Sequence, residues 1–275
     1  MLKCNNVITL GCRLNFWESS KINNFIKESY RKDLVVFNTC SVTNEAIKNA
    51  KKHIRTFHKM NPKVKIAVTG CGVESDHDFF RNMKEVSYII GNKEKLKESN
   101  WQKIQNTTIK KSSKNIIYKN IAKVNPSTSD VRKFVRIQNG CDHSCTFCII
   151  PSCRGDSQSE TVDNINKNIF FHLENGVKEI ILTGVDLTSW TEGNITNKKL
   201  GDLLEKIFIK NRSDFRLRLS SIDAAEIDDK LLDLIKNEPR LMPHFHFSLQ
   251  SLDDLILKRM KRRHNVRDIY QLFDK

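Results

Sequence analysis

The chain has 275 residues, with 47 Lys and Arg residues against 32 Asp and Glu residues and a formal net charge of +15 at pH 7. That length allows one large domain or two ordinary ones, each with a buried core. No apolar stretch approaches the ~20 residues needed to cross a bilayer, so the sequence predicts a soluble protein and excludes an integral membrane protein. The positive excess favours a polyanionic partner, most simply a nucleic acid. Heavy use of Lys, Asn and Ile, as in an AT-rich genome, is the alternative source of the charge.

The N-terminal part alternates short apolar runs with stretches of helical character. Strands alternating with helices indicate a parallel sheet with crossover helices, so the sequence predicts an α/β domain over residues 1–91. The expected strands are residues 7–10, 34–37, 64–69 and 88–91, and the clearest expected helices are residues 16–28 and 44–58.

Cys12, Cys40 and Cys71 each lie just past the carboxyl end of a different expected strand. In a parallel sheet these ends share one edge, which is where ligands bind, so three residues separated by dozens of positions would converge. Three unrelated buried cysteines are the alternative, because a free cysteine is often a small core hydrophobe. The repetition at three equivalent positions favours a metal cluster held by three thiolates.

The remainder of the chain begins with a connecting segment, residues 92–133, rich in Lys, Asn and Ser, for which we expect some weak strands. A strand–helix pattern then runs over residues 134–275 and predicts a partial (βα) barrel of about four units. A helix is expected at residues 161–175, with Ser159 or Thr161 as its N-cap and Gly176 at its end. The expected strands are residues 134–138, 179–183, 215–219 and 244–249.

Cys141, Cys145 and Cys148 follow the first of these strands with the spacing C-x3-C-x2-C. Three soft thiolate donors on one tight loop can hold three corners of a 4Fe–4S cube and leave the fourth iron without a protein ligand. Zinc sites usually present paired C-x2-C knuckles, and this loop has one such pair. A disulfide framework conflicts with the first ten residues, which lack the basic and apolar segments of a signal peptide. Iron–sulfur is the favoured interpretation and zinc the alternative, and we expect a cytoplasmic protein.

With these residues in place, the chain resembles the methylthiotransferases of the radical S-adenosylmethionine (SAM) superfamily. Residues 11–15 (GCRLN), 38–43 (NTCSVT) and 69–71 (TGC) match the N-terminal domain of that family, and residues 141–151 (CDHSCTFCIIP) with Arg154 and Gly155 match its radical loop. Residues 238–250 and 256–264 are most similar to the branch that modifies threonylcarbamoyladenosine in tRNA. The resemblance covers essentially the whole chain apart from one divergent segment.

The resemblance implies two 4Fe–4S clusters. The cluster on Cys141, Cys145 and Cys148 would bind the amino and carboxylate groups of SAM at its open iron, and one electron would break the sulfonium to give a 5′-deoxyadenosyl radical. The cluster on Cys12, Cys40 and Cys71 would hold or donate the inserted sulfur.

The resemblance also implies the reaction and its partners. A methylthio group would replace the C2 hydrogen of N6-threonylcarbamoyladenosine next to the anticodon of tRNA, a C–H bond unactivated toward acids and bases. One SAM would supply the methyl group and a second the radical. A loop base can be splayed into an active site, as RNA readers commonly require. The expected partners are tRNA and an electron donor of the reductase or flavodoxin type.

Contacts to the SAM cofactor are expected at five residues. Gly184 and Asp186 bound a tripeptide where the superfamily places a contact to the cofactor's amino group, with a plain turn as the alternative. Polar residues at strand exits line the active face of a βα barrel, and at those exits capping is the alternative role. The five expected contacts are Phe147, Gly184, Asp186, Ser220 and Gln250, with Ser221 as a further exit residue.

Three further features leave alternatives open. Arg154 would contact a carboxylate or phosphate, or be a surface cation. The basic run at residues 258–263 would face RNA or be a solvated helix end. Cys4 and Cys153 match no ligand position and are expected to be ordinary thiols.

Two departures from the family pattern concern the C-terminal part. Residues 251–253 (SLD) stand where the family usually has a glycine pair or Gly-Asp. The family barrel has six units followed by a tRNA-binding TRAM domain, and neither the last two units nor that domain is in this sequence. We therefore expect a truncated member, either a degraded gene product or one completed by a second chain.

Several alternatives to an active enzyme stay open. The chain would instead be a non-catalytic iron–sulfur or zinc protein that binds RNA, or an inert remnant. Within the family, the branches acting on isopentenyladenosine or on a ribosomal protein are the alternatives.

Overall fold

The computed structural model describes residues 6–27, 34–106, 131–192 and 197–275. It divides into two compact units. The first runs to Ser127 and also includes Ser152–Arg154, and the second comprises Thr128–Pro151 and Gly155–Lys275. No helix among the described residues is both long enough and apolar enough to cross a bilayer.

The first unit is built on a four-stranded parallel sheet with the order β1-β2-β3-β4. Its central strands pair over their whole length, from Leu34 opposite Lys65 to Thr39 opposite Gly70. This sheet confirms the parallel α/β fold expected from the sequence. The strands are β1 (Val7–Thr9), β2 (Leu34–Thr39), β3 (Lys65–Gly70) and β4 (Tyr88–Ile90).

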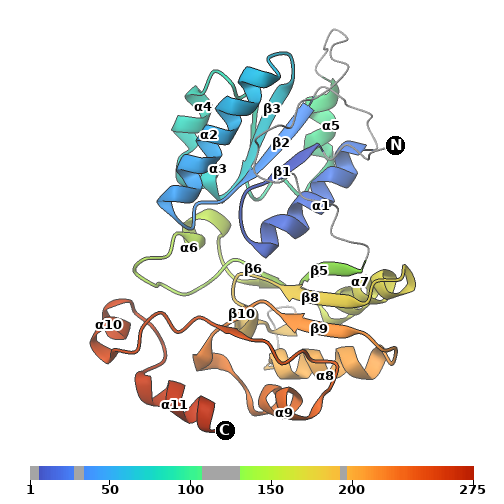
Figure 1. Cartoon of the computed structure of the whole chain (residues 1–275), viewed down its shortest axis with the longest axis vertical. Coiled ribbons are helices and arrows are strands. Elements are labelled where there is room, and N and C mark those ends of the chain that lie inside the picture. The colour runs from blue at the N-terminus through green and yellow to red at the C-terminus, as the bar shows by residue number, and fades with distance from the viewer. Residues whose placement is uncertain (1–5, 28–33, 107–130, 193–196) are drawn as a thin grey trace. The chain divides into compact units, whose positions relative to one another are not determined.

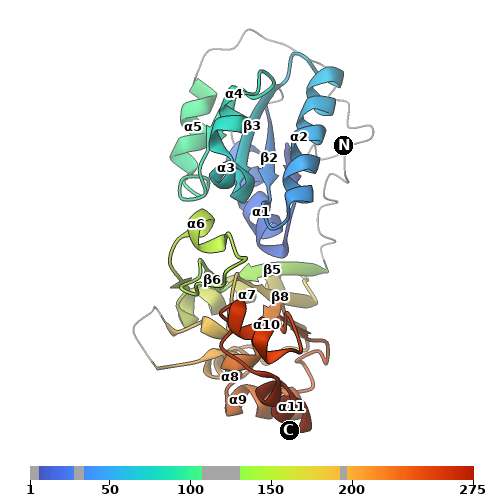
Figure 2. The same ribbon diagram turned by 90° about the vertical axis from the view of Figure 1, so that its left-hand side faces the viewer.

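Helices cover both faces of this sheet, and Figures 1 and 2 show α2 and α5 on opposite sides of the strands. Because side chains alternate along a strand, Val35 and Phe37 pack with α2 whereas Leu34 and Val36 pack with α1 and α5. The helices are α1 (Arg13–Lys27), α2 (Asn44–Met60), α3 (Cys71–Ser75), α4 (His77–Asn82) and α5 (Glu98–Asn106).

Helix α2 shows how the local sequence specifies these elements. The Thr43 side chain caps its N-terminus by accepting a hydrogen bond from the backbone N–H of Ala46 at 3.1 Å. Ala50, Ile54 and Phe57 recur at helical spacing and are fully buried against the sheet. Burying a side chain such as Phe57 stabilises the fold by about 1.5–3 kcal/mol.

The expectation of weak strands in residues 92–133 is wrong for its described beginning, where α5 lies. Trp101 of α5 is fully buried in the cluster formed with Ile22 and Ile26 of α1. Its indole Nε1 donates a hydrogen bond to the carbonyl oxygen of Lys95 at 2.8 Å. One buried aromatic residue therefore fixes a stretch whose composition looked like a linker. Residues 107–130 lie outside the described part of the chain.

The second unit contains a three-stranded parallel sheet with the order β5-β8-β9. The unit also contains two short two-stranded sheets: β10 and β11 pair in parallel, and β6 and β7 pair antiparallel. The strands are β5 (Arg132–Arg136), β6 (Gln138–Asn139), β7 (Gln158–Ser159), β8 (Glu179–Thr183), β9 (Arg216–Leu219), β10 (Ser221–Ile222) and β11 (His246–Phe247).

The strand expected at residues 244–249 is shorter than predicted, since β11 keeps two residues. Helix α7 begins as expected after Thr161, which caps it by accepting from the backbone N–H of Asn164. The helices of this part are α6 (Ile150–Arg154), α7 (Val162–Glu174), α8 (Leu200–Lys210), α9 (Asp229–Asn237), α10 (Asp254–Arg259) and α11 (Val266–Asp274), with short 3-10 turns η1 (Leu187–Ser189) and η3 (Ala224–Glu226).

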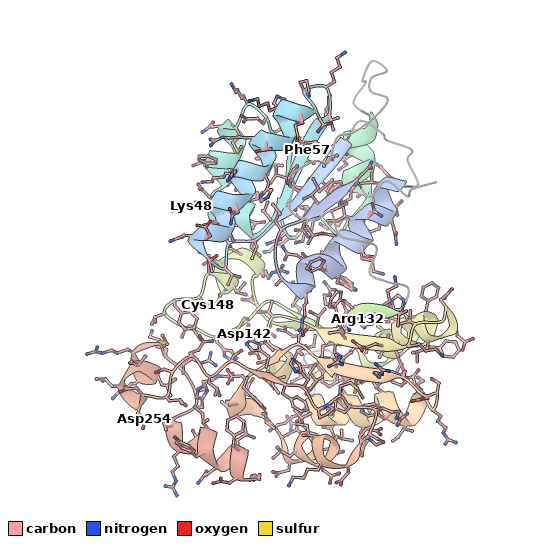
Figure 3. The ribbon with its side chains drawn as sticks, in the orientation of Figure 1. Lys48, Phe57, Arg132, Asp142, Cys148 and Asp254 are labelled. Carbon is pink, nitrogen blue, oxygen red and sulfur yellow. The ribbon has the colours of Figure 1, made fainter. Side chains whose placement is uncertain are left out.

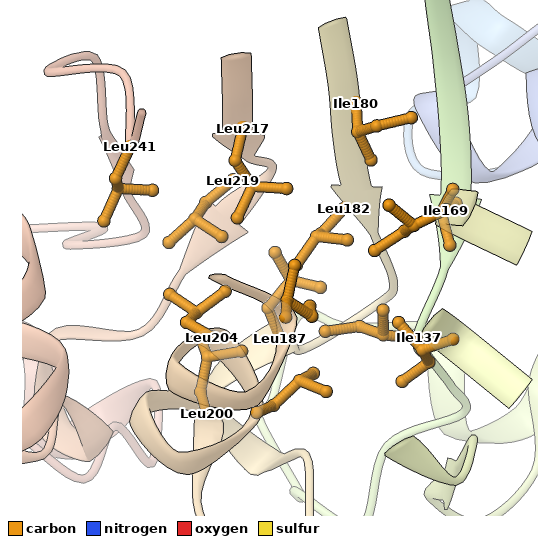
Figure 4. Close-up of a cluster of buried hydrophobic side chains, with 14 of the residues drawn as sticks. Ile137, Ile169, Ile180, Leu182, Leu187, Leu200, Leu204, Leu217, Leu219 and Leu241 are labelled. Carbon is orange, nitrogen blue, oxygen red and sulfur yellow. The ribbon is translucent and has the colours of Figure 1, made fainter. Parts of the chain in front are cut away.

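One apolar core holds the second unit together. Leu182 and Leu217 from the strands face Leu200 and Leu204 of α8 in this core (Figure 4). All four side chains are fully buried. This packing fixes the carboxyl ends of β5, β8 and β9, from which the polar loops of the unit emerge.

Candidate metal centres

The first unit brings Cys12, Cys40 and Cys71 together at one edge of its sheet. Cys40 follows β2 directly, Cys71 opens α3 directly after β3, and Cys12 immediately precedes α1. Burial raises the pKa of the Cys40 thiol, and the neighbouring thiols of Cys12 and Cys71 raise it further. A Cβ atom on Gly11 would lie 2.8 Å from the Cβ of Cys40, so glycine permits the loop before Cys12 to approach so closely.

A buried amide network connects the loops that carry these cysteines. The Asn15 side chain accepts from the Cys12 thiol at 3.4 Å and donates to the carbonyl oxygen of Thr39 at 3.0 Å. The hydroxyl of Thr39 donates to the carbonyl oxygen of Thr69 at 2.7 Å. The Asn38 side chain donates back to the carbonyl oxygen of Asn15 at 3.1 Å. These bonds tie together the three backbone segments that carry the cysteines.

Cys153, in the segment assigned to the first unit, is a buried thiol next to Cys71. Its sulfur lies 3.6 Å from the carbonyl oxygen of Cys71 and 3.7 Å from the hydroxyl oxygen of Ser41. The interaction between the two thiols lowers the pKa of Cys71 and raises that of Cys153. Cys4 lies outside the described residues.

Arg154 is a buried residue rather than a surface cation. Its guanidinium donates to the Glu18 carboxylate at 2.8 Å and to the Asn15 side-chain oxygen at 3.0 Å. The first of the two alternatives, contact with a carboxylate, is confirmed, and that carboxylate belongs to the protein itself.

In the second unit, Cys141, Cys145 and Cys148 lie on a loop whose base is the β6–β7 pair; Figure 3 labels Asp142 and Cys148 on it. The backbone N–H of Cys141 donates to the carbonyl oxygen of Gly155 at 3.1 Å, and that of Cys148 donates to Cys145 at 3.1 Å. Gly140 has φ +74°, and a Cβ there would lie 1.9 Å from the carbonyl oxygen of Asp156. The closure of this loop therefore requires glycine at position 140.

The thiols of this loop act on one another electrostatically. Burial is the largest cause that raises the pKa of Cys141 to about 11, with smaller contributions from Asp186, Cys148 and Cys145. A neutral thiol at Cys141 is thus favoured when no cation is near. A metal supplies the positive charge that such a set of thiols needs to ionise.

His143 lies between the first two loop cysteines and pairs with Asp186. Its Nε2 lies 2.8 Å from the Asp186 carboxylate, to which the Ser189 hydroxyl also donates at 2.7 Å. Burial raises the pKa of Asp186, but the bonds from His143 and Ser189 outweigh it and the pKa lies below its usual range. The bond to Asp186 likewise raises the pKa of His143. Candidate ligand atoms of Cys141, His143 and Asp186 lie within 4.8 Å of one another.

The expected cofactor contacts occupy three different environments. Phe147 is 52% exposed on the cysteine loop, and Ser220 is 5% exposed with a hydroxyl oxygen that has no hydrogen-bond partner among the described residues. Gln250 is exposed with φ +67°, a left-handed conformation that glycine adopts more readily. A Cβ on Gly184 would lie 2.9 Å from the carbonyl oxygen of Gln138. The Asp186 carboxylate is held by His143 and Ser189, and its backbone N–H donates to Gln138, so each of these groups already has a partner.

Gln138 was missed in the sequence analysis. Its side-chain oxygen accepts from the backbone N–H groups of Val185 and Asp186, both at 3.0 Å. Its side-chain nitrogen donates to the carbonyl oxygen of Gly140 at 2.7 Å. One amide therefore joins the cysteine loop to the turn after β8. The rule applied to Ser220 and Gln250, a polar residue that ends an apolar strand, also selects Gln138.

The basic run at residues 258–263 separates into exposed and buried cations. Lys258, Arg259 and Lys261 are exposed. The guanidinium of Arg262 instead lies 3.5 Å from the Cys145 sulfur and donates to Asp223 at 2.7 Å and to the carbonyl oxygen of Ser248 at 2.8 Å. A solvated surface is therefore the wrong interpretation for Arg262, and no local sequence signal distinguishes it from its neighbours.

Both groups of cysteines suit an iron–sulfur cluster chemically. Each offers three soft sulfur donors on closely packed backbone, and each has a cation or a polarising partner beside it: Arg154 in the first unit and Arg262 in the second. Donors of hydrogen bonds to ligand sulfurs and nearby charge are the features by which proteins adjust such clusters.

Two family models match the chain. The model described as the radical SAM superfamily matches residues 135–275, and the model described as uncharacterized protein family UPF0004 matches residues 5–91. The cysteine loop falls in the first match and Cys12, Cys40 and Cys71 in the second.

Two curated relatives that match this chain carry the same name. A protein of Rickettsia prowazekii named threonylcarbamoyladenosine tRNA methylthiotransferase MtaB is 42% identical over 273 residues, covering 98% of this chain and 64% of the relative. A protein of the same name from Aquifex aeolicus is 32% identical, covering 92% of this chain and 64% of that relative. The chain thus spans less than two thirds of the length of these relatives.

Among solved structures, the radical S-adenosylmethionine methyltransferase TsrM from Kitasatospora setae matches with a TM-score of 0.59 and 13% identity. The match covers 95% of this chain and 58% of that protein. At this identity the likeness concerns the fold.

Proposed function

Because this chain belongs to the radical SAM superfamily, we propose that it is a tRNA methylthiotransferase. The observation that carries the proposal is the presence of two separate cysteine trios, one at the sheet edge of the first unit and one on the loop between β6 and β7. A single trio would be enough for radical generation, whereas sulfur insertion needs a second sulfur-rich site. The 42% identity to a relative with this activity in its name supports the same assignment.

Each trio would hold one 4Fe–4S cluster. When bound at Cys141, Cys145 and Cys148, such a cluster supplies the electron that cleaves SAM reductively. The protein would hold the three cysteines in place for this cluster. Gln138 bonds the cysteine loop to the turn after β8, and the Arg262 guanidinium lies against the Cys145 sulfur. Cys12, Cys40 and Cys71 would hold the second cluster, which would hold or donate the inserted sulfur.

The SAM contacts proposed here are Phe147, Gly184, Asp186, Ser220 and Gln250. Ser220 has the strongest structural support, because its buried hydroxyl lacks a partner within the described part of the chain and a ligand would satisfy it. The exposed Phe147 ring offers a surface for stacking. A SAM contact at Asp186 would require an existing bond to open, since His143 and Ser189 hold its carboxylate and Gln138 accepts from its backbone N–H.

The proposed substrate is N6-threonylcarbamoyladenosine next to the anticodon of a tRNA, methylthiolated at C2. The net charge of +15 supports a polyanionic substrate. A loop base is reachable without opening a duplex. An electron donor of the reductase or flavodoxin type and a second chain that completes the barrel are further proposed partners.

The direct test is an assay with a chemical readout. The chain is purified and reconstituted with iron and sulfide under anoxic conditions, then incubated with SAM, a reductant and tRNA that carries threonylcarbamoyladenosine. Mass spectrometry of the digested nucleosides would detect the methylthio product. Methylthiolation of isopentenyladenosine instead would contradict the proposed substrate. Cleavage of SAM without any nucleoside product would contradict methylthiolation by this chain alone.

A zinc-binding, non-catalytic RNA-binding protein is the second candidate. The observation that favours it is the close approach of Cys141, His143 and Asp186, a mixed ligand set that zinc accepts. His143 and Asp186 already satisfy each other in an ion pair, which weighs against this candidate. One zinc per chain after anoxic purification, with no iron, would favour it.

A further inference from the structure

Three buried charged side chains lie beside the cysteine trio of the first unit. Glu18, Lys95 and Arg154 are 2%, 1% and 7% exposed. The Glu18 carboxylate accepts from Lys95 at 2.5 Å through one oxygen and from Arg154 at 2.8 Å through the other. Two cations and one carboxylate give this triad a net charge of +1 inside the fold.

The triad reaches the cysteines through Asn15. The side-chain oxygen of Asn15 accepts from Arg154 at 3.0 Å and from the Cys12 thiol at 3.4 Å. The carboxamide nitrogen of the same side chain donates to the carbonyl oxygen of Thr39, the residue before Cys40. The positive charge of Arg154 interacts electrostatically with the thiol groups of Cys71 and Cys12, and that of Lys95 interacts with the thiol group of Cys71. Arg154 and the Cys12 thiol therefore share one acceptor, the side-chain oxygen of Asn15.

Charge balance explains such an arrangement. A buried net charge is costly unless an opposite charge lies nearby. Three thiolates with a 4Fe–4S cube carry net negative charge, which increases when the cube takes up an electron. The reduction potential of such a cluster depends on nearby net charge and hydrogen bonds.

We propose that Arg154 and Lys95, held in place by Glu18, are positioning residues that balance the charge of the cluster on Cys12, Cys40 and Cys71 and raise its reduction potential. The inference rests on the proposed function in requiring a cluster at that trio. It goes beyond it in assigning a task to three side chains that ligate nothing. A core ion pair without this task would support folding but would leave the potential unchanged.

The test uses charge variants of the full chain in which Cys141, Cys145 and Cys148 are replaced by Ala, so that one cluster gives the signal. Arg154→Gln and Lys95→Met each lower the net charge of the triad by one, Glu18→Gln raises it by one, and the double variant Arg154→Gln/Glu18→Gln restores it. The reduction potential is measured by anoxic titration followed by EPR, with iron content determined for each sample.

The expected result is an ordered series. Loss of either cation should shift the reduction equilibrium at least tenfold toward the oxidised cluster, which corresponds to about 59 mV for one electron. Glu18→Gln should shift it in the opposite direction, and the double variant and Arg154→Lys should stay close to the reference. Arg218→Gln, which breaks an ion pair with Glu179 in the second unit, is the matched control and should cause no shift.

The failures are distinguishable. If the reference chain binds no iron, the proposed function fails, and the inference with it. If it binds iron but the potentials do not follow net charge, the inference alone is overturned and the triad has a purely structural role. Should Arg154→Gln fold poorly, Lys95→Met carries the same test, because Lys95 does not bond to Asn15.

Discussion

The guanidinium of Arg262 lies 3.5 Å from the sulfur of Cys145, 117 positions earlier in the chain. Arg262 is held there by Asp223 and by the carbonyl oxygen of Ser248, so its direction does not depend on the cysteine loop. A fixed cation beside a ligand sulfur stabilises the thiolate and withdraws charge from a bound cluster. One residue of the basic run therefore lies inside the protein, beside a cysteine of the loop.

Replacing Arg262 should therefore weaken the loop cluster. We expect Arg262→Gln to release iron to a chelator several times faster than the parent. The lost charge-assisted bonds should also lower the free energy of unfolding by about 1–3 kcal/mol. Lys258→Gln, in the exposed part of the same run, is the control and should leave the release rate unchanged. Equal rates for the two variants would contradict a role for Arg262 at Cys145.

Gly140→Ala should disrupt the same loop by a steric route. Its Cβ would lie 1.9 Å from a backbone oxygen, and φ +74° adds strain of about 1–3 kcal/mol. We expect the variant to lose most of the iron bound by the loop. Gly176→Ala shares a positive φ of +81° but has nothing within 4 Å of the added atom, so it separates strain from collision. Iron content compared between the two variants is the measurement, and similar values would contradict the steric argument.

The buried Glu18 should make the first unit sensitive to acid. Burial raises its pKa, but Lys95 and Arg154 outweigh burial and lower it from 4.5 to about 2. Because the folded pKa is below the unfolded one, the stabilisation is complete above pH about 4.5 and is lost as the pH falls toward 2.

Glu18→Gln should abolish that dependence, at a cost of about 3–5 kcal/mol near neutral pH because two cations lose their partner. The measurement is hydrogen exchange in α1 and β2 of the metal-free chain between about pH 5 and about pH 2, the range in which Glu18 takes up its proton. A variant with the same acid dependence as the parent would show that other carboxyl groups are responsible.

Ser220 offers a test of cofactor binding that is separate from stability. Removing a buried hydroxyl without a partner should leave folding unchanged or slightly improved, whereas loss of a ligand contact should weaken SAM binding by about three- to tenfold. The measurements are thermal unfolding and equilibrium binding of SAM for Ser220→Ala. Ser221→Ala is the matched control, since the Ser221 hydroxyl already bonds to His246 at 2.7 Å. Unchanged SAM affinity in Ser220→Ala would remove Ser220 from the site.

The sequence predicted those features that depend on local periodicity. Apolar runs such as residues 34–37 and 179–183 are fully buried strands in the structure, and a cysteine directly after a strand in a parallel sheet must lie at its carboxyl edge. Thr161 was recognisable as a helix cap because its hydroxyl replaces a missing backbone acceptor.

The features that were missed depend on contacts between distant residues. Lys95 and Trp101 lie in a stretch whose composition resembles a linker, and their burial follows from packing against α1. The Asp186–His143 pair and the Arg262–Cys145 contact join segments separated by dozens of residues, so no spacing rule indicates them. Charged residues are the hardest case, because a buried cation and a solvated one look identical in sequence.

The most direct test of the two-cluster account is iron and sulfide content after anoxic reconstitution, compared between the parent chain and two triple variants. One variant replaces Cys12, Cys40 and Cys71 with Ala, the other Cys141, Cys145 and Cys148, and Cys153→Ser serves as the control thiol. The account predicts that each triple variant keeps about half of the parent's iron, since each trio holds one of two equal 4Fe–4S clusters, and that Cys153→Ser keeps all of it. Complete loss of iron in one triple variant together with full retention in the other would contradict it.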